Sequence, residues 1–308
     1  MPWNVSRAES EPLSGHERSV PFELIDTDRA LAALLTRLQS ARLSRIAIDV
    51  EGENNLHRYG IHVALIQLFD GQHAWLVDPI AIRNRELLRD LMERSPWVKV
   101  WFDTASDLLA FRHSLDIGPA PILDLAIAAR LLGLKGGLHA LTGQPGSSSD
   151  KDRFQRANWM RRPLPRPLLE YAVSDVTHLL ELADRLVTEC NQKGLLFELL
   201  ARSWEAQTAP RVWNPFGNSF RIPGYNRMKP DERRRADLFW RAREYYAKQH
   251  DQPPEMAVPK ALLARLVELG PIDLSRISEE VRKASDGKIA QEDFVACIQQ
   301  AEKDSPTG

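Results

Sequence analysis

The chain has 308 residues, of which 43% are hydrophobic and 27% charged, so it can form one large domain or two ordinary ones with a sizeable core. A formal net charge of −1 excludes a protein that holds nucleic acid by overall charge, and any such surface must be local. Two distant cysteines, Cys190 and Cys297, exclude a disulfide framework. Because no segment resembles a signal peptide or a long apolar span, we expect no membrane contact and a cytoplasmic location.

The first part of the chain predicts several strands and one early helix. Residues 1–20 are polar and expected to be flexible. FELI predicts a short strand and DRALAALLTRLQSA an amphipathic helix, capped by Asp26 or Thr27. SRIAIDVEG, HVALIQLFDG and HAWLVDP predict three strands within 46–79, and Asp70-Gly71 is a hairpin turn signal. We therefore expect a mostly antiparallel meander here.

From residue 83 onward, helical and strand patterns alternate. Residues 83–94 predict a helix, VKVWFD a strand, and SDLLAFRHSL a helix with Asp103 or Thr104 near its start. ILDLAIAARLLGL predicts a buried helix, GQPGSSSD a flexible loop, and residues 167–190 one long helix. Strands followed by strand–helix alternation predict an α/β fold, with a mixed sheet and helices on both of its faces.

The last third differs in composition from the rest. TAPRVWNPFGNSFRIPGYNRMKP is rich in Pro, Gly and Asn and predicts a linker or connecting arm, over 205–229. Four short helical patterns follow: ERRRADLFWRAREYYAKQH, PKALLARLVEL, ISEEVRKAS and AQEDFVACIQQAEK. They predict a small all-α helical bundle domain over 230–303, after an α/β domain over 21–204.

Two acidic residues end the strand pattern SRIAIDVEG. Alternate strand residues face the same way, so Asp49 and Glu51 stand on one face, roughly 6–7 Å apart at Cα. Carboxylates this close repel each other unless they are protonated or bridged by a cation, and oxygen ligands suit Mg²⁺ or Mn²⁺. Taken alone, the D-x-E pattern fits a solvated strand end equally well.

A second pair lies on the helical pattern LLEYAVSDVTHLL. Tyr171 and Asp175 are four residues apart and share one helix face, roughly 5–6 Å apart at Cβ. The alternative is an interfacial tyrosine beside a surface carboxylate. Asp107, in WFDTASDLL, is a third candidate with nearby competitors. Among these, Asp103 is interpreted as a helix N-terminal residue, and Asp124 as a helix cap or an anchor in the core.

A local excess of positive charge precedes Tyr171. Residues 151–166 contain six basic side chains and one acid, a net charge of 6 − 1 = +5, interleaved with Phe154 and Trp159. Arginines neutralise phosphates and aromatic rings can stack on bases. The candidate nucleic-acid contacts are His57, Arg153, Arg156, Trp159, Arg161 and Arg162. The alternative is a solvated loop, with Trp159 in the core and His57 on a surface loop.

The joint pattern resembles the ribonuclease D family of DEDD 3′–5′ exonucleases, in its tyrosine subgroup, over roughly residues 22–200. The three motifs are IAIDVEGENNLHRYGIHVALIQLFDG, VKVWFDTASDLLAF and KDRFQRANWMRRPLPRPLLEYAVSDVTHLLELADRL. The resemblance implies a ribonuclease H-like fold, a mixed sheet flanked by helices. Two departures are Phe102, where relatives usually carry His, and a short loop at 142–149. Residues 222–303 resemble a helicase-and-RNase-D C-terminal (HRDC-like) domain.

The resemblance also implies the roles of the candidate site residues. Asp49, Glu51, Asp107 and Asp175 would hold two divalent cations, Mg²⁺ or Mn²⁺, with Asp49 bridging them, and Tyr171 would position the attacking water. The expected reaction releases nucleoside 5′-monophosphates from single-stranded RNA 3′ tails, such as those of tRNA precursors or other stable RNA. Two alternatives stay open, a DNA exonuclease and a non-catalytic RNA-binding scaffold. The sequence indicates no oligomeric state.

Overall fold

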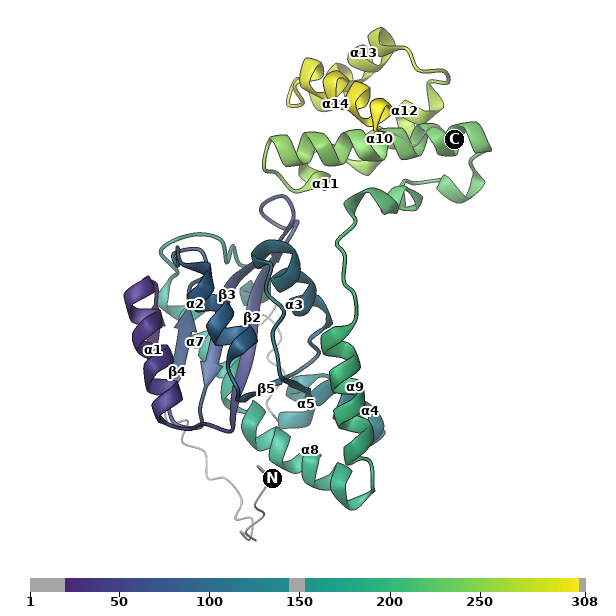
Figure 1. Ribbon diagram of the computed structural model, residues 1–308. Coiled ribbons are helices and arrows are strands. Elements are labelled where there is room, and N and C mark those ends of the chain that lie inside the picture. The colour runs from purple at the N-terminus through teal and green to yellow at the C-terminus, as the bar shows by residue number, and fades with distance from the viewer. Residues whose placement is uncertain (1–19, 144–152, 305–308) are drawn as a thin grey trace. The chain divides into compact units, whose positions relative to one another are not determined.

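The structure, a computed structural model, describes residues 20–143 and 153–304 (Figure 1). The chain divides into two compact units that are not continuous in sequence. The first comprises residues 1–52 and 62–211, and the second comprises residues 53–61 and 212–308. In the described part of the chain, no helix combines the length and the apolar character that a membrane crossing requires.

The first unit is built on a six-stranded sheet with the order β1-β4-β3-β2-β5-β6. The antiparallel pair β3–β4 lies beside the parallel pairs β1–β4, β2–β5 and β5–β6, so the predicted mixed sheet is confirmed. The hairpin between β3 and β4 turns at Gly71, with φ of +105°. The strands are β1 (Phe22–Ile25), β2 (Arg45–Asn54), β3 (Ile61–Phe69), β4 (Ala74–Val77), β5 (Val98–Trp101) and β6 (Ile122–Asp124).

Helices cover both faces of this sheet, as the sequence predicts (Figure 1). One core cluster joins the sheet to α1, α2 and the short π-helices η1 and η2; the other joins it to α4, α7, α8 and α9. The helices of the first unit are α1 (Asp28–Ser40), α2 (Arg85–Arg89), η1 (Asp90–Arg94), α3 (Ala105–Ala110), η2 (Phe111–Leu115), α4 (Leu125–Leu131), α5 (Leu138–Thr142), α7 (Arg166–Thr177), α8 (Leu179–Gln192) and α9 (Leu196–Thr208).

The central strand β2 has its two faces in different cores. Ile46 and Ile48 are fully buried in the cluster that includes α1. Ala47, between them, is fully buried in the cluster that includes α7 and α8. Since side chains alternate along a strand, Asp49 and Glu51 follow Ala47 onto the α7 face.

Two expectations about helices are wrong. Residues 167–190 form two helices, because α7 ends at Thr177 and α8 begins at Leu179. Near this break, the Ser174 hydroxyl donates to the Tyr171 carbonyl and the Thr177 hydroxyl to the Ser174 carbonyl, local bonds that bend helices. Ile122–Asp124 belongs to a strand, since it pairs with β5 before α4 begins. Of the predicted loop GQPGSSSD, residues 144–150 lie outside the described residues.

The second unit is the predicted helical bundle, with residues 53–61 added to it. Tyr59, from this short segment, is 9% exposed, and its ring lies edge-on to Trp213 at a centroid distance of 5.5 Å. Its hydroxyl bonds to buried Glu244. The helices are η3 (Pro215–Arg221), η4 (Tyr225–Arg227), α10 (Pro230–Gln249), α11 (Pro254–Ala257), α12 (Lys260–Glu268), α13 (Leu274–Ser285) and α14 (Gln291–Lys303).

Candidate metal centre

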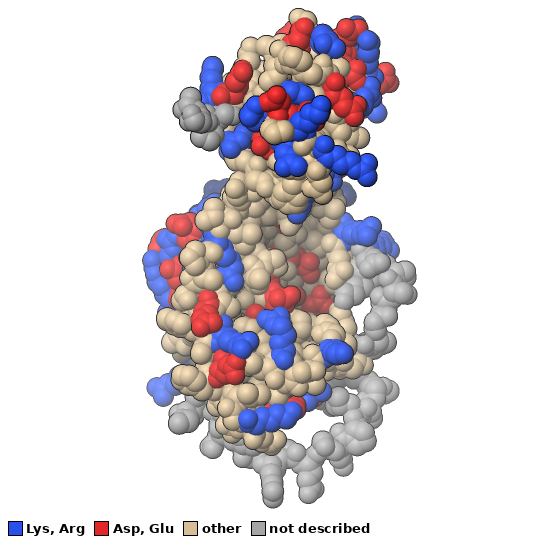
Figure 2. Space-filling model, turned by 90° about the vertical axis from the view of Figure 1, so that its right-hand side faces the viewer, with Lys and Arg blue, Asp and Glu red and all other residues tan. Residues whose placement is uncertain are grey.

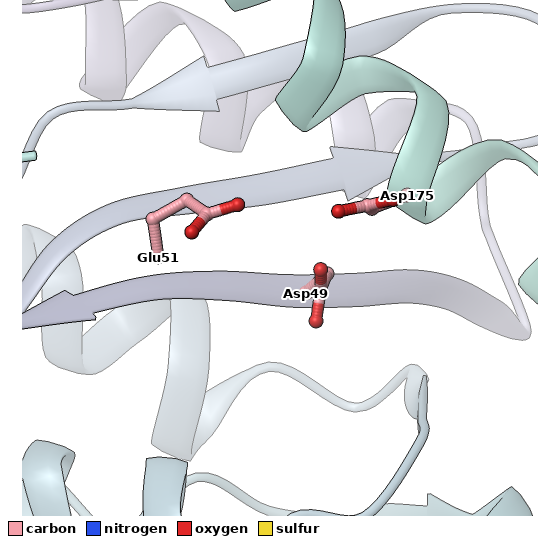
Figure 3. Close-up of side chains that lie close together, drawn as sticks. All are labelled: Asp49, Glu51 and Asp175. Carbon is pink, nitrogen blue, oxygen red and sulfur yellow. The ribbon is translucent and has the colours of Figure 1, made fainter. Parts of the chain in front are cut away.

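Three carboxylates meet between β2 and α7 (Figure 3). Asp49 and Glu51 come from β2 and Asp175 from α7, and one oxygen from each lies within 4.8 Å of the others. The strand alternation described above turns both β2 acids toward the helix. These three residues, called the acidic cluster below, are the group in the described chain whose spacing suits a shared metal ion.

Apolar packing fixes the helix that carries the third acid. Ala172, Val173 and Val176 of α7 are buried in the core cluster. Tyr171 and Asp175 are four residues apart on the partly buried side of this helix, and the tyrosine hydroxyl hydrogen-bonds to the aspartate. The ring of Tyr171 lies 5.0 Å from that of Phe154, measured between centroids. Tyr171 is therefore held by packing on one side and by Asp175 on the other.

Asp107 interacts with the acidic cluster electrostatically, but it is not among the residues whose carboxylate oxygens lie within 4.8 Å of one another. It stands in the first turn of α3, where its Oδ2 accepts from Trp101 Nε1 at 3.1 Å and its Oδ1 from the Ser106 hydroxyl at 3.3 Å. Its charge nevertheless raises the pKa of both Asp49 and Glu51. Asp107 and the three acids of the acidic cluster therefore influence one another through their charges.

Burial and mutual repulsion raise the pKa of these acids. For Asp49, burial is the largest cause, followed by the charges of Asp107 and Asp175. For Glu51, burial is again first, followed by Asp49. Burial raises the pKa of Asp107 to about 7, although its two hydrogen bonds act in the opposite direction. A divalent cation would relieve this repulsion, and an all-oxygen donor set suits Mg²⁺ or Mn²⁺.

A glutamine that the sequence analysis did not single out also faces the centre. Gln67 of β3 is fully buried, and its Nε2 lies 3.5 Å from Glu51 Oε1. Its Oε1 has no partner among the described residues, so a polar acceptor is free beside the carboxylates. An amide inside the apolar strand HVALIQLF is the signal that could have revealed it, because buried polar groups are normally hydrogen-bonded.

The basic segment divides into exposed and structural side chains. Arg153, Arg156 and Arg161 are exposed. Arg162 instead donates to Asp78 Oδ1 at 2.8 Å and to the Ala64 carbonyl at 2.6 Å, which ties it to the sheet. These bonds give Arg162 a structural role, and its contact with nucleic acid stays a prediction. Lys151 and Asp152, which enter the +5 charge, lie outside the described residues.

Trp159 and His57 also have structural partners. Trp159 is 1% exposed, and its indole N–H donates to the Phe154 carbonyl at 3.0 Å, so it is a core residue and not a base-stacking surface. His57 lies in the second unit, where its Nδ1 is 3.2 Å from Glu53 Oε2. Glu53 is 3% exposed and accepts the backbone N–H of His57, so this pair organises the 53–61 loop.

Figure 2 shows acidic side chains inside a hollow on the surface of the first unit, while lysine, arginine and further acidic side chains are interspersed over the rest of this face. The arrangement suits a reaction in which cations neutralise the carboxylates and the substrate together.

Known proteins resemble the chain over both units. A family model described as 3′–5′ exonuclease matches residues 22–191. Ribonuclease D of Xanthomonas oryzae is 30% identical over 261 residues, which cover 81% of this chain and 69% of that protein. The exosome complex exonuclease RRP6 of Saccharomyces cerevisiae is 28% identical over 86% of this chain but only 38% of its own length.

A solved structure gives the same result. Escherichia coli RNase D, described as an exoribonuclease involved in structured RNA processing, superposes with a TM-score of 0.70 at 25% identity, over 91% of this chain and 75% of that one. The chain spans about half or less of some other relatives, such as 56% of the ribonuclease D of Musicola paradisiaca and 40% of that of Haemophilus influenzae.

Proposed function

Since the chain belongs to the ribonuclease D family of 3′–5′ exonucleases, we propose that it is a metal-dependent exoribonuclease that releases nucleoside 5′-monophosphates from RNA 3′ ends. The observation that carries the proposal is the acidic cluster, with three carboxylate oxygens within 4.8 Å of one another in the fold of this family. A binding module has no need of converging buried carboxylates, whose repulsion lowers the stability of the fold.

Asp49, Glu51, Asp107 and Asp175 would hold two divalent cations, Mg²⁺ or Mn²⁺. When bound, these ions supply an activated water and stabilise the leaving 3′ oxygen. Asp49 would contact both ions, Glu51 and Asp175 would help to hold the ion that supplies the activated water, and Asp107 would help to hold the other.

Tyr171 would orient the attacking water. Burial and the neighbouring Asp175 raise the pKa of its hydroxyl far above its ordinary value of 10.0. The hydroxyl therefore keeps its proton at neutral pH and serves as a hydrogen-bond donor or acceptor, not as a base.

RNA is the proposed substrate because the similar proteins include several ribonucleases D. Arg153, Arg156 and Arg161 are exposed and would neutralise phosphates of the 3′ strand. The tails of tRNA precursors or other stable RNA are the proposed targets. We also propose that residues 21–204 form the exonuclease domain, 205–229 the connecting arm and 230–303 an HRDC-like domain.

Matched oligonucleotides test this function. RNA and DNA of one sequence, labelled at the 5′ or the 3′ end, are incubated with Mg²⁺ or Mn²⁺. We expect labelled mononucleotide from 3′-labelled RNA and a ladder from 5′-labelled RNA. Asp175→Asn should lower the rate roughly 10³-fold or more, because it removes a charge at the reacting centre. Asp116→Asn is the matched control, since Asp116 is exposed and lies outside the acidic cluster.

The other outcomes separate the alternatives. Faster degradation of DNA would establish the DNA exonuclease. Binding of RNA that is unchanged by Mn²⁺, with no degradation by the wild-type protein, would establish the scaffold. Release of internal fragments would contradict exonuclease action.

A further inference from the structure

A buried acid outside the acidic cluster binds the turn that leads into α3. Asp124, the last residue of β6, is 3% exposed. Its Oδ1 accepts from the backbone N–H of Asp103 at 3.0 Å and of Ala126 at 2.9 Å. Its Oδ2 accepts from the backbone N–H and from the hydroxyl of Thr104, at 3.1 and 3.0 Å. One carboxylate thus satisfies four donors from two segments of the chain.

Three of these four bonds hold the turn between β5 and α3. Asp103 has a φ of +58°, in the left-handed region that few residue types adopt readily. Thr104 follows at the N-cap position of α3, and its own side chain makes no capping bond to the helix. Its carbonyl accepts the backbone N–H of Leu108 at 2.9 Å, which starts the helix. The start of α3 is therefore fixed from β6 and not from within.

Asp107 stands in the turn that is fixed in this way. It is three residues beyond Thr104, so a rotation or shift of the first turn of α3 would move its carboxylate directly. On the other side, Asp124 is itself immobilised, because its backbone N–H donates to the Ser203 hydroxyl of α9 at 3.3 Å and its side chain caps α4. A rigid anchor is thereby connected to a side chain of the metal centre.

We propose that Asp124 is a positioning residue for the metal centre: it sets the place of Asp107 by binding the Asp103–Thr104 turn. This inference rests on the proposed function, in which Asp107 holds a cation. Partners behind the ligands commonly control metal affinity and activity roughly 10- to 100-fold. A residue that served only as the cap of α4 would alter stability alone.

Asp124→Asn is the principal variant. Asparagine keeps the size of the side chain, but its NH₂ group cannot accept from both donors of Thr104. We expect kcat to fall roughly 10- to 100-fold with KM changed little, and the Mn²⁺ concentration that gives half-maximal activity to rise by a similar factor. Independently of activity, Mn²⁺ should raise the Tm of the variant only at higher concentrations than it does for the wild-type protein.

Three further variants separate positioning from simple destabilisation. Thr104→Val removes one hydroxyl donor and should shift the Mn²⁺ midpoint in the same direction, whereas Thr104→Ser keeps the donor and should restore the wild-type midpoint. Asn84→Ala removes a comparable cap, since Asn84 Oδ1 accepts the N–H of Glu86 at 3.1 Å at the start of α2. It should lower Tm without shifting the midpoint.

These experiments distinguish a wrong inference about Asp124 from a wrong proposed function. A wild-type protein that neither degrades RNA nor gains Tm with Mn²⁺ overturns the proposed function and the inference together. If the wild-type protein is active and Asp124→Asn shows the same midpoint and kcat, the inference alone is overturned. Should Asp124→Asn fail to fold, identical midpoints for Thr104→Val and Thr104→Ser overturn it instead.

Discussion

Single residues at the metal centre oppose the stability of the protein when no cation is bound. Asp49, Glu51 and Asp107 all have raised pKa values, with burial as the largest cause. The folded protein therefore binds protons that the unfolded chain releases. The same closely spaced carboxylates that would bind a metal ion thus lower the stability of the metal-free protein. Residues that lower stability in this way are typical of functional sites.

The first prediction concerns Asp107 in metal-free protein. Its pKa is about 7 in the folded state against an ordinary value of 3.8. The stabilisation by the bound proton is complete below the lower value and is lost as the pH rises through the higher one. In the wild-type protein the free energy of unfolding should fall between pH 5 and 8 as Asp107 loses its proton. In Asp107→Asn this fall should be smaller by roughly 1–4 kcal/mol. Urea titrations in EDTA measure it, and an unchanged pH slope contradicts it.

The second prediction concerns Gln67. Leucine at this position removes the amide beside Glu51 and the acceptor without a partner. Gln67→Leu should lower the exonuclease rate roughly 10-fold or more, because Glu51 loses a neighbour that orients it. The Tm should stay constant or rise, since an unsatisfied buried acceptor has been removed. A falling Tm with a normal rate would assign Gln67 to the fold alone.

At the scale of elements, local pattern and long-range contact explain different features. The amphipathic helix at 28–40 begins after Thr27, whose side chain accepts the N–H of Ala30 at 3.2 Å, so Thr27 is confirmed as the cap and the alternative, Asp26, is not. The strand Ile122–Asp124 was missed because its three residues owe their conformation to pairing with β5. The periodicity of apolar residues reflects only residues close together in the sequence, so it does not indicate pairing with a strand such as β5.

The third prediction contrasts two adjacent arginines of the basic segment. Arg161 is exposed, whereas Arg162 pairs with Asp78, which is 2% exposed. Arg161→Gln should reduce the slope of log Kd for RNA against log salt concentration by about 0.7, with Tm unchanged. Arg162→Gln should cost about 1.5–3 kcal/mol of stability, because buried Asp78 loses its charged partner and keeps, among the described residues, only the backbone N–H groups of Ile80 and Ala81.

Salt-dependent binding and urea unfolding measure these two effects. Arg94→Gln is the control for both, since Arg94 is an exposed residue of η1, among the helices on the opposite face from α7. Equal effects of Arg161→Gln and Arg162→Gln on stability would contradict the contrast between them.

At the scale of the whole molecule, residues 53–61 join the helical unit, although they comprise the end of β2, the loop after it and the first residue of β3. Arg58 Nε donates to Asp251 at 2.8 Å, and Tyr59 packs on Trp213. Contiguous domain boundaries, such as those expected from the sequence, do not anticipate this. Composition changes locate linkers, but they carry no information about a loop that packs against a distant segment.

The fourth prediction follows from this division. A chain that ends at residue 211 would leave Tyr59 without Trp213 and Glu244 and Arg58 without Asp251. Limited proteolysis should then cut within 53–61 much faster than in the full chain, because cleavage follows local unfolding. The full chain with Tyr59→Phe, which loses only the hydroxyl, serves as the control. Equal cleavage rates in the truncated and full chains would contradict the packing described.

The sequence by itself determined the α/β class, the succession of most strands and helices, the helical bundle and the family resemblance. These features follow from periodicity, capping residues and motif order, which act over a few residues. The tertiary structure alone decided that Trp159 lies in the core, that Arg162 pairs with buried Asp78, that Gln67 faces Glu51, and that Asp124 holds the start of α3. Each depends on contacts between distant residues, and a local pattern does not record which distant segment a side chain will meet.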